Sequence, residues 1–498
     1  MVAGLVAGAL AWPWYKDVSY WVGPAVALMA ITTLHLVFSS PLIVPFPQIA
    51  ILITGLQYVV AAWLSFYYPP TNPTYDIGNR VAEYLAYGSG ATIAFALGWG
   101  AALMKSAGGI CRPSQASRKL LNELDVLFWF GLFCGLAARF IPFQSLAFLL
   151  VLLANLRYVG AFGRMLLLGD GWRWRIGLTL ANEVLLATGV GMFHTLLLWA
   201  ASGFAIYLYR LRPNRGLILL WVLLGGLLLP SFQEAKWKIR ENVWYGGTAE
   251  LSGARPSAFP SSARLAFNWL GYLADDFYRT VTLSWEEEFL TDSLVRYNQG
   301  WIINRVMQHV PETEPYARGE TLITAAKAAM LPRILAPEKH LSGGRLYMAR
   351  FAGVELESAS MNLGFAGEMY ANFGYYGGIG GCFLYAAALG LMVRWVIKRA
   401  SRAPLWWVFV PYFGVFAIKA EEGIADVLNW LVKGAVIIAA VYFLFPALRA
   451  ALSTKQQAPE KEDAIPRPSR KRGRGMGPGR AAMPSPSSPE PQPQPEGL

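Results

Sequence analysis

Long apolar stretches recur along the chain and predict membrane-spanning helices. A helix needs about 20 apolar residues to cross the ~30 Å hydrocarbon core of a bilayer, and Ile43–Phe66 and Val81–Met104 are typical of such helices. We interpret the first stretch, Met1–Trp12, as a retained span, because no charged residue precedes it and no cleavage motif follows. The pattern predicts an all-α polytopic membrane protein with about ten spans, near residues 1–14, 19–38, 43–66, 81–104, 121–139, 177–208, 214–231, 373–395, 404–420 and 426–448.

Basic side chains predict the orientation of these spans, since short loops rich in Lys and Arg stay in the cytoplasm. Three short loops are basic, and the tail after Thr454 is basic as well. Their residues are Lys105, Arg112, Arg118 and Lys119 in the first loop, Arg210, Arg212 and Arg215 in the second, and Lys398, Arg399 and Arg402 in the third. With an even number of spans, both termini are then cytoplasmic.

The segment Phe143–Leu168 is apolar but contains Arg157 and Arg164. If 177–208 crosses once, parity keeps this segment on the outer side as a re-entrant element near 143–168, with both arginines facing an outer cavity. The alternative is that the segment crosses and that 177–208 folds as a tight hairpin. The re-entrant interpretation is preferred here, because each arm of that hairpin would be shorter than the ~20 residues of a span.

The region from Phe232 to Asn372 has an ordinary polar composition, and the same rule places it outside. Prolines divide it, which predicts short helices packed over the membrane domain. The tail is rich in Pro, Ser, Gln and Arg and is predicted to be disordered. The chain is thus divided into an N-terminal bundle (1–231), a large helical outer loop (232–372), C-terminal helices (373–450) and a disordered cytoplasmic tail (451–498).

Composition excludes a soluble enzyme. Only 15% of the 498 residues are charged, whereas soluble domains have about 25%. The net charge is +12, and the segment 451–498, with eight basic and five acidic residues, contributes +3, which leaves +9 on the rest. The three cysteines, Cys111, Cys134 and Cys382, predict neither a disulfide framework nor a metal site. No Walker loop, GxSxG elbow or HExxH pair is present.

Two basic residues follow the predicted span 214–231. In the run SFQEAKWKIRENVWYGG, Lys236 and Arg240 are four residues apart, so a helix places them on one face, where like charges repel each other. A bound dianion would reverse this effect, which makes a diphosphate clamp one interpretation. The other is a juxtamembrane face that contacts lipid headgroups.

Further polar groups gather in the middle of the loop. In YARGETLITAAKAAMLPRILAPEKH, Glu320 is a candidate base and Arg333 a candidate anion contact, and surface ion pairing is the alternative for both. In RYNQGWIINR, an aromatic ring stands among hydrogen-bonding groups, which suits a sugar face or an anchor at the membrane interface. This group consists of Arg296, Asn298, Trp301 and Arg305.

Glu368 stands alone among glycines and aromatic residues in MNLGFAGEMYANFGYYGGIGGCF, just before the predicted span 373–395. An acidic side chain at this depth is costly unless it is paired or functional. Glu368 is therefore the second candidate base. The glycines that follow it favour close helix packing.

The order of these features resembles the Wzy-type O-antigen polymerases, membrane enzymes that polymerise lipid-linked oligosaccharide repeat units. The resemblance runs from Leu228 to Leu391 and rests on the runs KWKIRENVW, RYNQGWIINRV, PYARGETL, LPRILAPEK and GEMYANFGYYGGIGG. The first half of the chain is similar only in its many spans.

The resemblance implies a metal-independent membrane glycosyltransferase, without a cofactor, in the cytoplasmic (inner) membrane of a bacterium. Polyprenyl-diphosphate-linked oligosaccharides would be both donor and acceptor; membrane lipid and a chain-length regulator would be further partners, and nucleic acid would not. Glu368 or Glu320 would take the proton from the acceptor hydroxyl. The leaving diphosphate would be held by Lys236, Arg240, Arg333, Arg157 and Arg164.

Two other functions remain open at this point. A glycan ligase would use the same donor and differ in its acceptor. A flippase for the lipid-linked saccharide would place its cationic groups between two pseudo-symmetric halves. In this sequence the cationic groups gather in one loop and its flanks instead.

We predict that a cysteine placed at position 260 reacts with a membrane-impermeant reagent only from outside the cell, because the flanking short loops carry the Lys and Arg excess. Labelling in whole cells, compared with labelling in inverted vesicles, measures this directly. A residue 260 that reacts only in inverted vesicles would contradict the predicted orientation.

Overall fold

The computed structural model describes residues 22–38, 45–70, 72–76, 80–104, 117–138, 140–141, 144–190, 193–211, 214–240, 259–282, 295, 297–331, 344–356, 361–414 and 416–453. They belong to one of the two compact units of the chain, Met1–Ala458. The other unit, Pro459–Leu498, lies outside the described residues, and so does most of the predicted tail.

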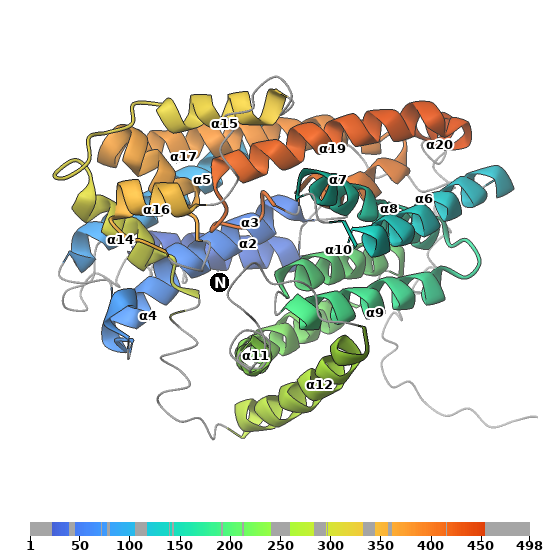
Figure 1. Ribbon diagram of the computed structural model, residues 1–498, viewed down its shortest axis with the longest axis horizontal. Coiled ribbons are helices and arrows are strands. Elements are labelled where there is room, and N and C mark those ends of the chain that lie inside the picture. The colour runs from blue at the N-terminus through green and yellow to red at the C-terminus, as the bar shows by residue number, and fades with distance from the viewer. Residues whose placement is uncertain are drawn as a thin grey trace, which may run out of the picture. The chain divides into compact units, whose positions relative to one another are not determined.

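Every regular element in the described ranges is a helix, which confirms the predicted all-α class (Figure 1). The elements are α2 (Val22–Phe38), α3 (Phe46–Gly55), the π-helical turn η2 (Leu56–Val60), α4 (Ala61–Tyr67), η3 (Pro73–Tyr75), α5 (Val81–Leu103), α6 (Arg118–Ala137), α7 (Gln144–Ala154), α8 (Leu156–Leu167), α9 (Trp172–Val190), α10 (His194–Leu211), α11 (Arg215–Arg240), α12 (Phe259–Val281), α14 (Gly300–His309), α15 (Glu320–Met330), α16 (Arg345–Ala352), α17 (Gly364–Ala400), η5 (Pro404–Val408), α18 (Phe409–Gly414), α19 (Ile424–Leu444) and α20 (Pro446–Ser453).

Five helical stretches of the described chain are long and apolar enough to cross a membrane. They are Phe46–Tyr67, Arg118–Ala137, Leu146–Leu167, Gly364–Ala400 and Ile424–Leu444. The chain is therefore a helical membrane protein, as its composition predicts. Helices also form at the predicted spans 19–38, 81–104 and 214–231, and their crossing remains a prediction. The predicted span 1–14 lies outside the described residues.

α6 packs along α8 in the opposite direction. Where the helices touch, Gly131 lies so close to α8 that a Cβ added to it would be 2.3 Å from Arg157 N, and one added to Gly160 would be 2.4 Å from Leu124 O. Further along, Gly169 of the turn after α8 lies against Leu121. The turn after α8 is therefore at the same end of the bundle as the basic start of α6.

This packing favours the crossing alternative for 143–168 over the preferred re-entrant interpretation, which is not confirmed. The segment forms α7 and α8, and its 22-residue stretch Leu146–Leu167 is long and apolar enough to cross a membrane. The stretch 177–208, which we expected to be one span, is instead two helices, α9 and α10, that contact each other. The structure thus agrees with the crossing alternative. α9 has 19 residues and α10 has 18, and neither is among the five stretches of the described chain that are long and apolar enough to cross.

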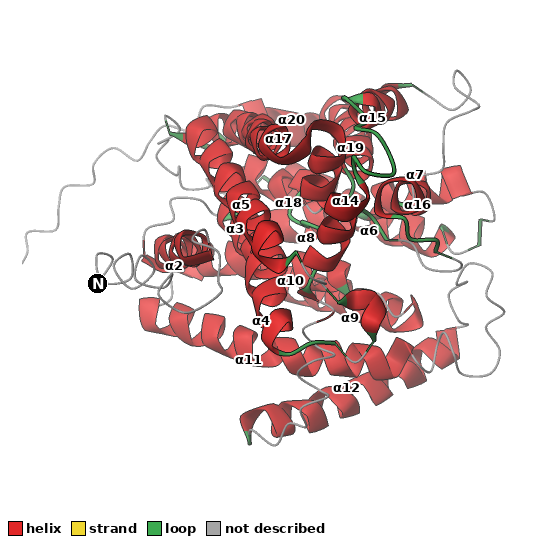
Figure 2. Ribbon diagram, turned by 90° about the vertical axis from the view of Figure 1, so that its left-hand side faces the viewer, coloured by secondary structure: helices red, strands yellow, loops and turns green. Residues whose placement is uncertain are grey.

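α5 and α17 run side by side in the same direction and form the largest helix contact of the described chain (Figure 2). Small residues allow this approach: a Cβ on Gly98 would lie 2.3 Å from Phe383 O, and one on Gly390 would lie 2.5 Å from Ala102 Cβ. Both helices end at basic loops, so their common direction agrees with the predicted cytoplasmic placement of both loops.

The predicted span 404–420 is not one helix. Pro404 and Pro411 interrupt the hydrogen-bond ladder, and the chain forms the short elements η5 and α18, followed by turns up to Gly423. Trp406 at one end donates to Leu452 O, and Tyr58 donates to Ala420 O at the other end. Most of the segment is buried, which is the condition for irregular backbone at membrane depth.

The helices of the predicted outer loop differ in length. α14, α15 and α16 are short, and they gather near the start of α17, with α15 lying along α19 (Figure 1). α12 is 23 residues long and packs on α11 and α9. The predicted boundaries at 231 and 372 fall inside α11 and α17, so helices continue through them.

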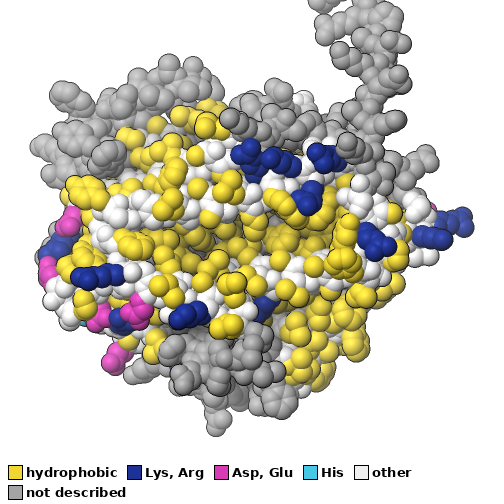
Figure 3. Space-filling model, turned by 90° about the horizontal axis from the view of Figure 1, so that it is seen from above, with side chains coloured by type: hydrophobic (Ala, Val, Ile, Leu, Met, Phe, Trp, Pro, Cys, Tyr) yellow, Lys and Arg dark blue, Asp and Glu magenta, His cyan; other side chains and the backbone are white. Residues whose placement is uncertain are grey.

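The face that carries α15, α17 and α19 is largely apolar (Figure 3). Large apolar side chains stay exposed on α17 and α19, among them Leu384 (67%), Val436 (65%) and Phe443 (69%). Acidic side chains on this face gather at its left edge, on the side of α14 and α16 (Figure 3). A face with many exposed large apolar side chains is typical of contact with lipid.

We predict that cysteines at positions 170 and 119 react from the same side of the membrane, and that one at position 313 reacts from the other side. The three native side chains are exposed, and the α6–α8 packing puts positions 119 and 170 at one end of the bundle. Labelling of each single-cysteine variant in sealed vesicles tests this. Reaction of positions 170 and 313 from the same side would restore the re-entrant interpretation.

Candidate functional site

Glu368 lies in the first turns of α17, where every residue from Gly364 to Asn372 is buried. Its side chain is only 1% exposed. Oε2 accepts a hydrogen bond from Ile424 N, the first residue of α19, at 3.0 Å, and Oε1 has no hydrogen-bond partner among the described residues. A buried carboxylate with one open oxygen is costly for stability, so it points to a function.

The turns between α18 and α19 surround this carboxylate with polar groups. Lys419 donates to Glu422 Oε1 at 2.6 Å, and Asn362 Nδ2 donates to Glu422 Oε2 at 3.4 Å and to Asp426 Oδ2 at 3.2 Å. Gln57 donates to Glu421 Oε2 at 2.6 Å. Three further carboxylates, Glu421, Glu422 and Asp426, therefore lie on the segment around Ile424, whose N–H binds Glu368, and Lys419 pairs with Glu422. Sequence reasoning noticed only one of the four as a candidate.

A turn from the PYARGETL run is attached to the same end of α17. Ala317 N donates to Ala371 O at 2.9 Å, and Arg318 N donates to Asn372 O at 3.1 Å. Arg318 adopts a left-handed backbone conformation, with φ of 49°, and its side chain is exposed. Strained residues of this kind occur often at functional sites. Arg318 was not among the predicted anion contacts.

Glu320, the other candidate base, is exposed and paired. Arg350 Nη1 and Nη2 donate to its two oxygens at 2.8 and 3.1 Å, and Arg350 Nε donates to Glu314 Oε1 at 2.6 Å. The hydrogen bonds from Arg350 lower the pKa of Glu320 below its ordinary value. Glu320 therefore stays ionised at neutral pH with both oxygens occupied, which makes it a weak base.

Tyr347 of α16 lies within electrostatic reach of both candidate bases. Burial raises the pKa of its hydroxyl, and the carboxylates of Glu368 and Glu320 raise it further. Tyr347 therefore stays protonated at neutral pH. It is a neutral hydroxyl between the buried carboxylate and the surface.

The predicted sugar-binding residues are mostly buried. Asn298 is 1% exposed, and its Oδ1 accepts from Gly300 N at 2.8 Å, which starts α14. Trp301 is 4% exposed and packs edge-on against Tyr75. Arg305 is half-buried, and Arg296 lies outside the described residues. Asn298 and Trp301 thus stabilise α14 in its place beside α17, and Arg305 alone of the described three is open to a ligand.

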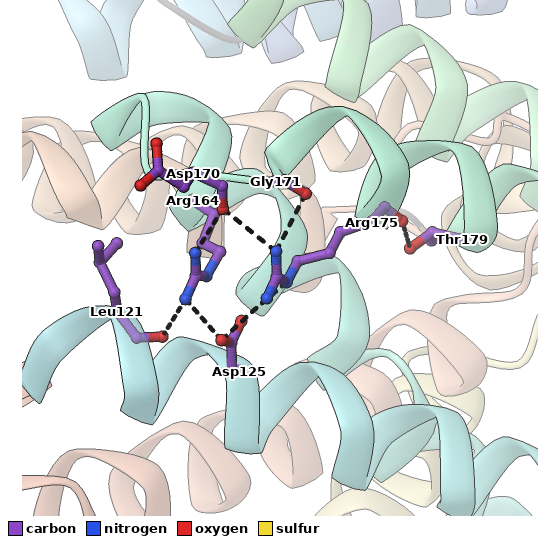
Figure 4. A network of polar contacts seen from close by, with 7 residues as sticks. All are labelled: Leu121, Asp125, Arg164, Asp170, Gly171, Arg175 and Thr179. Atoms are coloured by element: carbon purple, nitrogen blue, oxygen red, sulfur yellow. Dashed lines mark hydrogen bonds and ion pairs between the residues drawn. The ribbon is translucent and has the colours of Figure 1, made fainter. Parts of the chain in front are cut away.

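The predicted clamp residues Arg157 and Arg164 are buried and already paired. Arg157 forms an ion pair with Glu183 and donates to Ala154 O. Arg164 donates to Asp125 Oδ2 at 2.5 Å, and Arg175 bonds to the same carboxylate (Figure 4). Both arginines are far less open to a diphosphate than we expected, because protein carboxylates neutralise them where the helices pack. Both are structural partners within the helix bundle, and their role as diphosphate contacts stays a prediction.

The remaining clamp candidates are only partly described. Lys236 is half-buried near the end of α11; the side chain of Arg240 and the whole of Arg333 lie outside the described residues. In the same run, Lys238 donates to the buried Asp276 of α12 at 2.7 Å. That ion pair joins α11 to α12, and it gives part of the run a structural role.

No group of three or more His, Cys, Asp or Glu side chains in the described part of the chain could hold a metal ion. Compared with family models, with curated proteins and with solved structures, the chain matches none of them significantly. The helical membrane fold and the buried carboxylate site therefore carry the functional argument.

We predict that Asp125→Asn lowers the free energy of unfolding in detergent by about 3–5 kcal/mol, because it leaves two buried guanidinium groups without their counter-charge. The side chains of Arg164 and Arg175 are 8% and 9% exposed in their ion pairs with Asp125. Glu312→Gln, which breaks an exposed pair with Arg80, is the matched control and should change little. Equal effects of the two substitutions would show that the Asp125 cluster does not stabilise the bundle.

Proposed function

We propose that this protein is a polymerase that joins polyprenyl-diphosphate-linked oligosaccharide repeat units into a surface polysaccharide. The transfer is independent of metal and takes place at the outer face of the bacterial cytoplasmic membrane. Three runs that carry the resemblance to Wzy-type polymerases support this proposal. Two of them lie close together in the sequence, and both pack against the third, more than 40 residues further on, at the start of α17: α14 contacts α17, and Ala317 and Arg318 donate backbone hydrogen bonds to residues 371 and 372.

Glu368 is the residue that we assign as general base. The acceptor hydroxyl attacks the anomeric carbon of the donor, its proton passes to Glu368, and the bond from that carbon to the diphosphate oxygen breaks, leaving the electron pair on the diphosphate. Glu368 suits this step because it is a buried, poorly hydrated carboxyl group and its Oε1 makes no hydrogen bond within the usual geometric limits among the described residues. Glu320 suits it less, since Arg350 occupies both of its oxygens.

The diphosphate leaving group needs positive charge where its own charge develops. Arg318 supplies an exposed guanidinium on the turn bound to α17. Next to it, Phe373 is 43% exposed and Tyr376 is 86% exposed, which offers apolar contacts for a lipid tail. Lys236, Arg240 and Arg333 stay candidates for the same role.

We predict that Glu368→Gln reduces polymer formation by about a hundredfold or more, the usual size of general base catalysis. Purified protein is incubated with a lipid-linked repeat unit, and the products are resolved as a ladder on a gel. Glu320→Gln is the matched control and should keep most of the activity, because its carboxylate is engaged by Arg350.

Three results would contradict the proposal or part of it. Full activity of Glu368→Gln would remove Glu368 as the base. If the wild-type protein consumes the donor without a ladder and transfers a finished glycan to another lipid or protein, it is a ligase. A protein that only moves the lipid-linked saccharide across vesicles would be a flippase.

A further inference from the structure

We propose that Asn372 is a positioning residue of the polymerase, which holds the Glu368 segment of α17 and the Arg318 turn in one fixed arrangement. This inference rests on the proposed function. It adds a residue that does not touch the reacting atoms itself and that acts through the two groups proposed to touch them, the carboxylate of Glu368 and the guanidinium of Arg318.

The side chain of Asn372 bonds to three residues in two separate parts of the chain, the 319–321 segment and the first turns of α17. Nδ2 donates to Thr321 Oγ1 and to Glu368 O, each at 2.7 Å, and Oδ1 accepts from Gly319 N at 2.8 Å. The residue is 1% exposed, so these bonds are shielded from water. A buried amide that uses both of its donors and its acceptor has one orientation only.

The bond to Gly319 holds a turn that an ordinary chain would avoid. Arg318 and Gly319 both have positive φ, at 49° and 92°, and only glycine adopts such values readily. Two backbone hydrogen bonds to residues 371 and 372 and the Asn372 side chain hold the turn in this conformation. The direction in which Arg318 leaves the turn therefore depends on Asn372.

The hydrogen bond from Asn372 to Glu368 O lies within the first turns of α17, before a break in that helix. Gly374 has φ of 69° and ψ of −162°, so the helix is kinked two residues after Asn372. The first turns, which carry Glu368, are therefore not aligned by the membrane-crossing part that follows. Asn372 lies at the end of those turns and ties them to α15 through Thr321.

The same bonds explain why no other residue type fits this position. Asn372→Ala removes all three contacts. Asn372→Asp keeps an acceptor for Gly319 N and nearly the same shape, but it replaces the donor that faces Glu368 O with an oxygen, and two acceptors repel each other. Both variants weaken the connection between the turn and the first turns of α17, which is then left to the two backbone hydrogen bonds to residues 371 and 372.

A double-mutant cycle tests the proposal in the full-length protein. Turnover of a lipid-linked repeat unit is measured for the wild type, Asn372→Ala, Glu368→Gln and the double variant. We expect Asn372→Ala to lower kcat by about a hundredfold, as for a displaced catalytic group. In the Glu368→Gln background, the same substitution should have little further effect, because two residues that act through one step are not additive.

Two controls separate positioning from folding. Asn155→Ala removes another buried amide, 5% exposed, at the break between α7 and α8, and it should leave kcat unchanged. Asn372→Asp tests the same role with little change in volume, in case the alanine variant fails to fold. Thermal unfolding in detergent identifies the folded variants.

The outcomes distinguish the two claims. If the wild-type protein forms no polymer, the proposed function fails. If the wild type polymerises but the folded Asn372 variants keep their kcat, or lose activity by the same factor with and without Glu368, Asn372 is a structural residue only.

Discussion

The hydrogen bond from Ile424 N to Glu368 joins the starts of two long helices, and much of the structure is arranged around it. The first N–H groups of a helix have no partner within the helix, and the start of α19 is buried, where water cannot replace that partner. Glu368 supplies it at 3.0 Å, and the partial positive charge of the helix start favours the carboxylate. The same bond holds the turns before α19 against the start of α17.

Those turns are possible only because the bundle encloses them. Between Pro404 and Gly423 the chain leaves regular helix, and its polar backbone must find partners inside the protein. Tyr58, for example, donates to Ala420 O at 2.6 Å. Polar residues therefore concentrate at this end of α17. The acidic side chains Glu421, Glu422 and Asp426 lie where this irregular stretch ends and α19 begins. A site for polar chemistry at the edge of a membrane needs such a break.

A different use of charge stabilises the helices α6, α8 and α9. Glycines let α6 and α8 approach closely, and Arg164 of α8 pairs with Asp125 of α6. Arg157 of α8 pairs with Glu183 of α9, which connects these helices to α9. In each pair the carboxylate neutralises the arginine, so the arginines of α8 can lie in an apolar stretch. The charge of these arginines is neutralised within the protein and serves packing, whereas Glu368 Oε1 has no such cationic partner among the described residues.

Sequence by itself determined the helical membrane class, the places of most helices and the unusual position of Glu368 as an acidic residue in an apolar run. These follow from local properties: the length of an apolar run fixes what can cross a bilayer, and a lone carboxylate in such a run is expensive wherever it folds. Only the tertiary structure decided that 177–208 is two helices, that Arg157 and Arg164 meet carboxylates of other helices, and that Glu320 is bound by Arg350. It also decided that Asn372 joins two segments about 50 residues apart. A partner on a distant helix leaves no mark on local composition, because packing selects it by shape and distance in space.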